Sequence, residues 1–429
     1  MIKLSNLSAR IWLQRARTLE SMRNYEEAIS STNKSLEFSH PEDQNFKEAQ
    51  SLKESLIEDL GFQYLESGRE KGSEKNYEEA IKDFNQAIKL LPNNVNAYQW
   101  RGNCFKSLDK FQDAISDFSR VISLDPNNEN VYALRGLIYS KLSQHQKAID
   151  DFTKAIKLNP NDCDLLVVRS ELYLEIGQKE KAIEDLTKAI QINPEQASLY
   201  KERSHIYDDL GKYQEAINDV TQVLNIDPDP VSYIYRGSLF QNCLHEYQFA
   251  IDDFTKASSF ELDIPQESLL YEGRGRCYIG VKQFQSAISD FSCLLQLDSA
   301  NANGYLLRGV CYKELESYKD ALRDLTQALK LDPSLTEAYE AKARIYHELG
   351  DTQSTVAEYN KCLRINPNHA NAYYMRGLIY FKMNEMEKGV DDLLMAQALS
   401  KKQGNTKGYD DATKILAAAK VKLAKMMNT

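Results

Sequence analysis

Apolar residues recur along the chain with two superimposed periods. In residues 132–160, "YALRGLIYSKLSQHQKAIDDFTKAIKLNP", Tyr139 and Leu142 of the first half and Phe152 and Ala155 of the second lie three positions apart, which is the spacing of one face of an α-helix. The polar stretch "SQHQ" between the halves predicts a turn. A very similar segment, "YQWRGNCFKSLDKFQDAISDFSRVISLDP", stands 34 residues upstream. The chain is therefore predicted to repeat one helical hairpin at a fixed period.

Prolines mark the end of most repeats. The residue before a proline is pushed out of helical geometry, and proline itself cannot continue a helix, so we expect each hairpin to end there. The residues at this place are Pro92, Pro126, Pro160, Pro194, Pro228, Ser299, Pro333 and Pro367. With the proline as place 32 of a 34-residue unit, eleven repeats fit the chain.

Place 8 of the unit is small in every repeat. Glycine inside a helix costs about 1 kcal/mol relative to alanine, so its recurrence calls for a packing reason. Place 20 is alanine in most repeats, and small residues that face each other allow two helices to approach closely. The residues at place 8 are Ala16, Gly68, Gly102, Gly136, Ser170, Ser204, Gly237, Gly275, Gly309, Ala343 and Gly377. We predict that the two helices of a hairpin cross at places 8 and 20.

The whole pattern resembles the tetratricopeptide repeat. It has Trp or Tyr at place 4, a small residue at 8, Tyr or Phe at 11, Ala at 20, Phe or Leu at 24, Ala at 27 and Pro at 32, as that family does. The resemblance covers about residues 9–403. It implies an all-α fold, a right-handed α-solenoid superhelix of tandem helical hairpins, with a concave groove lined by the first helix of each hairpin. No hairpin buries its own face, so such a fold is stabilised by stacking of neighbours.

The period is interrupted before the second repeat and again after the seventh. Eighteen residues precede the second repeat, yet Ala49, Leu52, Leu56 and Leu60 keep one helical stripe through this insertion, which predicts one long helix. A separate helix that breaks at Gly61 is the alternative. At the second interruption, the turn "QNCLHEYQ" has one extra residue and the stretch "ELDIPQESL" has three. These extra residues are expected to bend the groove or to form a joint.

The chain is expected to end in a capping helix, because an amphipathic stripe follows the last hairpin. This stripe consists of Ala412, Ile415, Leu416, Ala419, Leu423 and Met426. The expected order is a first hairpin at 9–42, a long inserted helix at 43–75 that leads into the second repeat, repeats 2 to 7 at 61–264, an inserted linker at 265–267, repeats 8 to 11 at 268–403 and the capping helix at 405–427.

Arginine recurs at place 7 and aspartate at place 23, nine times each. We predict that they pair into a structural ladder rather than bind an acidic ligand. Its first members are Asp83, Arg101, Asp117, Arg135, Asp151 and Arg169.

Two exceptions bear on how the ladder pairs. At the interrupted junction, Ser31 replaces the aspartate of the first repeat and Ser67 replaces the arginine of the second. This joint loss favours pairs between neighbouring repeats, Asp83 with Arg101 and Asp117 with Arg135. Lys342 and Glu358 deviate together within the tenth repeat, which instead favours pairs within a repeat. We prefer pairing between repeats as the working hypothesis.

The resemblance also implies which residues face the groove, since places 2, 5, 6, 9, 12 and 13 tend to do so in the family. Many are apolar here, and an exposed apolar stripe of this length is typical of a surface that binds a partner segment. The predicted groove residues are Trp100, Leu134, Leu137, Val167, Val168, Leu174, Ile234, Tyr235, Leu306, Leu307, Val310, Tyr374, Met375, Leu378 and Phe381. The alternative is that tight curvature or the ends of the chain cover them.

Charge and composition narrow the function. A net charge of −10 and a pI near 5.3 argue against broad binding to nucleic acid or an anionic membrane, which need a clustered basic surface. No apolar run is long enough to span a bilayer, and the start "MIKLSNLSAR" is unlike a secretory signal. We expect a cytoplasmic protein. In one variant of this expectation it is associated with a cilium or the cytoskeleton.

No metal, cofactor or catalytic site is predicted. Seven cysteines without CxxC spacing disfavour a zinc knuckle or disulfide framework, and six scattered histidines form no triad or HExxH motif. The "GRG" triplet at 273–275 lies inside a predicted helix, where a phosphate loop is not expected. One charged stretch mimics a metal site but is read as a solvated face: Glu171, Glu175, Lys201, Glu202, His205, Asp208 and Asp209.

The main hypothesis is a non-enzymatic adaptor or scaffold that holds a partner protein segment in the groove, within a larger complex. One alternative is a structural subunit of a ciliary or cell-cycle assembly that homodimerises through the first hairpin and the long helix. Another is a chaperone cofactor. This last alternative is disfavoured, because no three consecutive repeats supply the Lys, Asn and Arg clamp with which some members of the family bind chaperone carboxyl termini.

Overall fold

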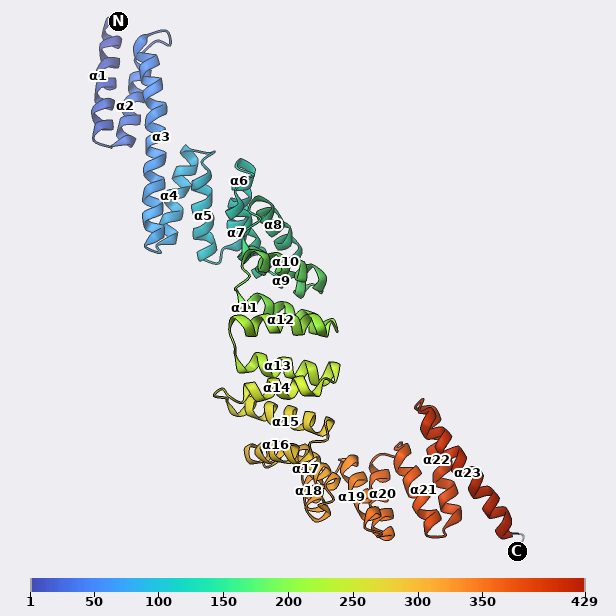
Figure 1. Cartoon of the computed structure of the whole chain (residues 1–429). Coiled ribbons are helices and arrows are strands. Elements are labelled where there is room, and N and C mark those ends of the chain that lie inside the picture. Colours follow the sequence, from blue (N-terminus) through green and yellow to red (C-terminus); the bar gives the residue numbers. More distant parts are fainter. Residues whose placement is uncertain (1, 428–429) are drawn as a thin grey trace. The chain divides into compact units, whose positions relative to one another are not determined.

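The computed structural model describes residues 2–427, and the side chains of residues 6–419. Within this range the regular structure is helical, and it contains no strand. The helices divide into two compact blocks that meet between residues 206 and 207. We call them the N-terminal block and the C-terminal block, and each is described by itself. Figure 1 shows the order of the helices.

The N-terminal block holds α1 to α10 and most of α11. Their bounds are α1 Ile2–Ser21, α2 Tyr25–Glu37, α3 Gln44–Ser73, α4 Tyr77–Leu90, α5 Val95–Ser107, α6 Phe111–Leu124, α7 Glu129–Lys141, α8 His145–Leu158, α9 Cys163–Glu175, α10 Lys179–Ile192 and α11 Ala197–Asp209.

The C-terminal block begins within α11 and holds the remaining helices. Their bounds are α12 Tyr213–Ile226, α13 Pro230–Leu239, the π-helical turn η1 Phe240–Leu244, α14 Tyr247–Ala257, α15 Ile264–Gly280, α16 Phe284–Leu297, α17 Ala302–Glu314, α18 Tyr318–Leu331, α19 Thr336–Glu348, α20 Thr352–Ile365, α21 Ala370–Lys382, α22 Met386–Lys402 and α23 Thr406–Met427.

Within each block, consecutive helices pair as antiparallel hairpins and neighbouring hairpins stack on each other, so the fold is an all-α solenoid. Within a block, the first helices of neighbouring hairpins also contact each other, as α3 does with α5 and α13 does with α15. The first helices therefore line one face of each block, which we call the inner face.

One residue in the turn of each described hairpin has a left-handed backbone. Its φ lies between 54° and 79°, and only three of these residues are glycine. A left-handed conformation costs an ordinary residue about 1 to 2 kcal/mol, so the stacked helices on both sides must hold these turns. The residues are Arg23, Lys75, Asp109, Ser143, Gly177, Gly211, His245, Lys282, Glu316, Gly350 and Asn384.

The small residue at place 8 is explained by the aromatic residue at place 24 of the same repeat. A Cβ atom added to Gly102 would lie 2.7 Å from Phe118, and one added to Gly68 would lie 2.7 Å from Phe84. Phe84 and Phe118 are buried. The close approach that the sequence predicts is therefore present, but its main partner is a ring at place 24 and not only the alanine at place 20.

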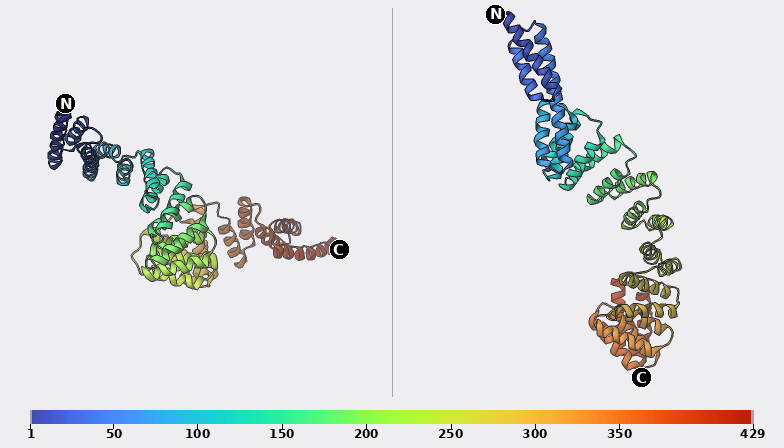
Figure 2. Two further views of the ribbon diagram at one scale, coloured as in Figure 1. Left: turned by 90° about the horizontal axis from the view of Figure 1, so that it is seen from above. Right: turned by 90° about the vertical axis from the view of Figure 1, so that its left-hand side faces the viewer.

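α3 is a single helix of 30 residues that passes from the α1–α2 hairpin to α4 without interruption (Figures 1 and 2). It does not break at Gly61. A Cβ atom on Gly61 would lie 2.6 Å from the side chain of Leu91, which occupies the place before proline where other repeats have Asp or Asn. Gly61 therefore serves helix packing and not helix termination.

The second interruption is absorbed without a linker. The expected linker at 265–267 is wrong, because these residues form the first turn of α15, whose start is fixed by a capping box between Asp263 and Gln266. The extra residue in the turn before α14 is accommodated as the π-helical turn η1, which is the usual form of a one-residue insertion in a helix. Both insertions thus extend helical structure.

The last helix, α23, packs on α22. Ala412 and Leu416 are buried against Leu393 of α22, and Ile415 packs beside them. This contact shields the side of the α21–α22 hairpin on which no further repeat stacks. Leu423 and Met426 of the predicted stripe lie outside the residues whose side chains the structure describes.

The contact between places 8 and 24 predicts a compensating pair of substitutions. Gly102→Ser should destabilise the protein by about 1 to 3 kcal/mol, because it overpacks the core against Phe118. Adding Phe118→Leu should recover part of this loss, since the fifth repeat has the natural combination of Ser170 and Leu186. Urea unfolding of both variants measures the effect. Equal stability of the wild type and Gly102→Ser would contradict the packing argument.

Candidate partner-binding groove

The arginine at place 7 pairs with the aspartate at place 23 of the same repeat. In Arg135, Nε donates to Oδ2 of Asp151 at 2.8 Å and Nη2 donates to Oδ1 at 2.7 Å. The same two bonds, at 2.6 to 3.2 Å, join six further pairs: Arg101–Asp117, Arg169–Asp185, Arg236–Asp253, Arg274–Asp290, Arg308–Asp324 and Arg376–Asp392. The preferred pairing between repeats, Asp83 with Arg101 and Asp117 with Arg135, is therefore wrong.

Six of these arginines, all but Arg274, also connect neighbouring repeats through their remaining nitrogen, and Arg203 makes the same bond. Nη1 of Arg135 donates to Oγ of Ser119, at place 25 of the preceding repeat, at 2.8 Å. The guanidinium also lies 5.8 Å from the ring of Tyr139. The acceptors at place 25, at 2.5 to 3.1 Å, are Asn85, Ser119, Thr153, Thr187, Thr221, Ser292 and Asn360. We call this arrangement the arginine clamp.

The clamp is mostly buried. Across the seven pairs the arginine side chains are 9 to 18% exposed and the aspartates 2 to 8%. The hydrogen bonds to Asp151 raise the pKa of Arg135. Removing one partner of a buried pair leaves an uncompensated charge and costs about 3 to 5 kcal/mol. The clamp is therefore structural and not available to an acidic ligand.

Three repeats depart from the clamp. In the first, place 23 holds Ser31 in place of aspartate. In the second repeat, Asp83 accepts from Oγ of Ser67 and from Nζ of Lys71, each at 2.6 Å. In the tenth, Nζ of Lys342 lies 3.5 Å from Oε1 of Glu358, whose buried Oε2 has no hydrogen-bond partner among the described residues. The joint substitution in the tenth repeat thus keeps the charges within one repeat but loses the bidentate geometry.

The predicted groove residues differ in how far they are exposed. Leu137 and Leu174 are 42% and 37% exposed. Ile234 and Leu306 are buried in the cores of the seventh and ninth repeats, so these two predictions are corrected: they are core residues. The others are half-buried: Trp100, Leu134, Val167, Val168, Tyr235, Leu307, Val310, Tyr374, Met375, Leu378 and Phe381. Of these, Tyr374 and Phe381 pack against residues that also contact α23.

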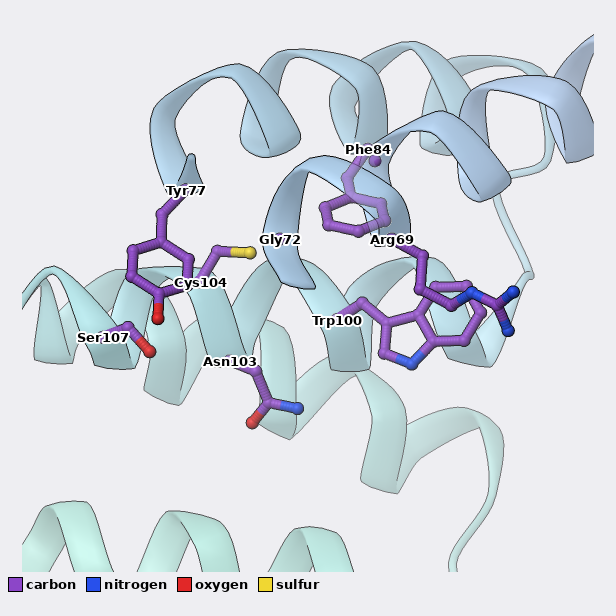
Figure 3. Close-up of a pocket in the computed structure, with 9 residues that line it drawn as sticks. Arg69, Gly72, Tyr77, Phe84, Trp100, Asn103, Cys104 and Ser107 are labelled. Atoms are coloured by element: carbon purple, nitrogen blue, oxygen red, sulfur yellow. The ribbon is translucent and has the colours of Figure 1, made fainter. Parts of the chain in front are cut away.

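A pocket of about 150 Å³ opens on the inner face between α3 and α5. We call it the α3–α5 pocket. Figure 3 shows Phe84, Trp100 and Tyr77 around it, with Arg69 beside the indole of Trp100. Burial raises the pKa of the Cys104 thiol in its wall to about 11. The complete lining is Gly68, Arg69, Gly72, Tyr77, Phe84, Trp100, Asn103, Cys104 and Ser107.

A second pocket, of about 230 Å³, opens between α17 and α19. It is more polar than the first. On its rim, Glu340 accepts hydrogen bonds from Arg344 and from Asn371 of α21, each at 2.6 Å, and lies 3.3 Å from Nε2 of His369. The bond from His369, with support from Arg344, lowers the pKa of Glu340 to about 2, and the same bond raises the pKa of His369.

The two pockets show which places form the inner face. Their inner-face lining residues occupy places 2, 5, 6, 9, 12 and 13 of the repeat, for example Trp100 at place 6 and Val310 at place 9. The charged stretch in the fifth and sixth repeats also reaches this face, where burial, followed by repulsion from Glu171, raises the pKa of Glu202. No group of His, Cys, Asp and Glu side chains in the described residues has the arrangement of a metal site.

Sequence reasoning missed three features of the arginine clamp and of the inner face. The acceptors at place 25 vary between Ser, Thr and Asn, so they show no single-residue signal. The contact of Glu340 with Asn371 joins residues 31 positions apart, in different repeats. Gly72 leaves room for the α3–α5 pocket, but it stands outside the recurring small place. A comparison of the same place across all repeats would have singled out Gly72.

Family models match most of the hairpins. Models described as "Tetratricopeptide repeat" match residues 9–39, 95–128, 130–162, 152–184, 197–230, 302–335 and 370–403, and one described as "TPR repeat" matches residues 68–109 and 343–384. A search of curated proteins gave no significant match. Among the helices of the described residues, none is long and apolar enough to cross a membrane.

Several solved structures are similar to this chain. The crystal structure of MamA protein is 25% identical, with a TM-score of 0.37 over 41% of this chain and 95% of that chain. YrrB, titled a TPR protein with an unusual peptide-binding site, is 22% identical, with a TM-score of 0.40 over 44% of this chain and 97% of that chain. Yeast Tom70 is 17% identical, with a TM-score of 0.40 over 97% of this chain and 96% of that chain.

The tenth repeat should be stabilised by restoring the clamp. Lys342→Arg combined with Glu358→Asp should add about 1 kcal/mol, the net worth of a typical buried hydrogen bond. Hydrogen exchange should then slow in α19 and α20. As a matched control, Arg308→Lys with Asp324→Glu should speed exchange in α17 and α18. Unchanged exchange in both variants would show that bidentate geometry does not control local stability.

The contact between Glu340 and His369 predicts a pH effect. Because the carboxylate stabilises the imidazolium, the pair contributes stability below the unfolded pKa of histidine, about 6.5, and loses it as the pH rises through the raised folded pKa. Glu340→Gln should lower the pKa of His369 in an NMR titration. Glu337→Gln, which changes a weaker neighbour on the same helix, should lower it less. Equal shifts in the two variants would contradict the assignment.

Proposed function

Because the chain belongs to the tetratricopeptide repeat family, we propose that it is a non-catalytic adaptor that holds a segment of a partner protein against the inner face of its repeats. Its repeats form a protein-interaction scaffold. The finer proposal concerns where the partner binds. Fold alone does not identify a function, so the argument rests on the inner face itself.

The observation that carries the proposal is the exposure of apolar residues on first helices. Leu137 of α7 and Leu174 of α9 stand at inner-face places and are 42% and 37% exposed. They lie near the half-buried Leu134 and Val168, which pack against core clusters shared with the second helix of the preceding repeat, α6 for Leu134 and α8 for Val168. Together they form an apolar strip on two successive first helices, interrupted by the exposed Glu171 at place 9 of α9, and exposed apolar residues of this kind mark interaction surfaces.

The strip is firmly positioned. The arginine clamp fixes the register of each hairpin, and Arg169 on α9 is almost completely buried. A partner segment would therefore meet a preformed surface, and little ordering of the scaffold would oppose binding. This property suits an adaptor that presents one segment to a larger assembly.

The test compares two pairs of exposed leucines. Leu137→Glu with Leu174→Glu places charges on the inner face, whereas Leu158→Glu with Leu331→Glu does so at the ends of the second helices α8 and α18. All four leucines are 37 to 42% exposed. Affinity capture with the full chain should lose the same partners in the first variant and keep them in the second.

A loss of partners supports the proposal only if both variants remain folded. Circular dichroism should show that both variants keep the helix content of the wild type. If partners are kept by the inner-face variant and lost by the control, the partner binds the second helices and the proposal is wrong.

A further inference from the structure

We infer that the α3–α5 pocket and the cations near it bind a partner segment in which a bulky apolar residue is flanked by acidic residues. The inference rests on the proposed function, because it names the class of segment that the inner face of the second to fourth repeats would hold. It depends on two independent observations, the origin of the pocket and the local balance of charge.

The pocket exists because Gly72 has no side chain. A Cβ atom on Gly72 would lie 3.8 Å from Sγ of Cys104 and 4.0 Å from Cβ of Ala80, which are ordinary contacts. Gly68, one turn earlier, is different, since its Cβ atom would meet Phe84 at 2.7 Å. Packing therefore requires glycine at 68 but not at 72. A helical glycine costs about 1 kcal/mol relative to alanine, and at 72 its effect is to keep the pocket open.

The pocket suits one apolar side chain. Phe84 and Tyr77 of α4 and Trp100 and Cys104 of α5 form the apolar part of its wall (Figure 3). An apolar cavity of about 150 Å³ accommodates a group the size of benzene, so the side chain of Leu, Met or Phe fits. Aromatic walls add favourable contacts to such a group. The occupant of the pocket is therefore an anchor residue of the partner segment.

Cations dominate the inner face around this pocket, although the whole chain has a net charge of −10. At inner-face places of the second to fourth repeats stand Arg69, Lys106 and Lys141, against the single carboxylate Glu66. Among the described residues, none of the three cations forms an ion pair. Arg69 lies 6.0 Å from the ring of Trp100, at the mouth of the pocket.

The cationic surface ends at α9. There the inner-face places hold Asp164, Glu171 and Glu175, all exposed. Complementary charge steers association and fixes the register of a bound segment. Carboxylates of a partner would thus be attracted to the second to fourth repeats and repelled by the fifth, which places the acidic residues of the segment beside its anchor residue.

The experiment selects binders without assuming a sequence. A display library of random 12-residue peptides is selected on the full chain, and the enriched peptides are measured by fluorescence anisotropy. We expect them to share an apolar residue next to Asp or Glu. Gly72→Leu should weaken their binding by about tenfold, since interface anchors dominate binding energy, whereas Gly72→Ala, which adds a single methyl group to the pocket wall, should weaken it less.

Charge is tested separately. Arg69→Glu with Lys106→Glu should weaken binding by about tenfold and reduce its salt dependence. Lys154→Glu with Lys157→Glu makes the same change of charge on exposed residues of the second helix α8 and should have little effect. Because all four residues are at least partly exposed, these charge variants test the inference even if Gly72→Leu disturbs the fold.

The outcomes separate the two proposals. If the enriched peptides lack acidic residues, or if they bind the Gly72→Leu and Arg69→Glu/Lys106→Glu variants as tightly as the wild type, the inference is wrong. If those peptides nevertheless fail to bind the Leu137→Glu/Leu174→Glu variant, the proposed function stands. If no peptide is enriched, or if none of these inner-face variants weakens binding, both proposals fail.

Discussion

Most of the regular repeats depend on one largely buried arginine that holds three helices together. In the case of Arg135, the guanidinium on α7 bonds Asp151 on α8 of the same hairpin and Ser119 on α6 of the preceding one. Hydrophobic burial drives the stacking but has no direction. The planar guanidinium does have direction, because its donors are fixed in one fork. The same guanidinium therefore fixes both the angle between the two helices of a hairpin and the register between stacked hairpins. These two quantities determine the geometry of the inner face.

The periodic part of the fold was predictable from sequence because the same physical requirement recurs in each hairpin. The spacing of prolines and small residues predicted the hairpins, and the family resemblance predicted the solenoid. The ladder residues were identified, but their partners were assigned to the wrong repeats. Ser31 and Ser67 suggested pairing across the junction, whereas Asp83 is satisfied by Lys71 on its own hairpin. A count of charges cannot reveal that a lysine one turn away substitutes for an arginine.

The departures from the period could not be derived from spacing, because they depend on contacts between distant residues. Gly61 reads as a helix breaker, yet its role is set by Leu91, thirty positions later and just after the end of α4. Ile234 and Leu306 stand at places that face the groove in the family, but in this chain the second helix of their own repeat and the first helix of the next repeat bury them. The pocket beside Trp100 depends equally on the absence of a side chain at Gly72, which is informative only once α4 and α5 are in place around it.

The π-helical turn at Phe240–Leu244 shows how the array absorbs a change in length. Around it, Arg236 lies 15 residues after Thr221 and 17 before Asp253, whereas Arg135 lies 16 from each of its partners. A loop shortened on one side is balanced by a turn lengthened on the other. The gain or loss of a single codon therefore changes the structure only locally, and the hairpins that follow keep the regular spacing of their repeat places.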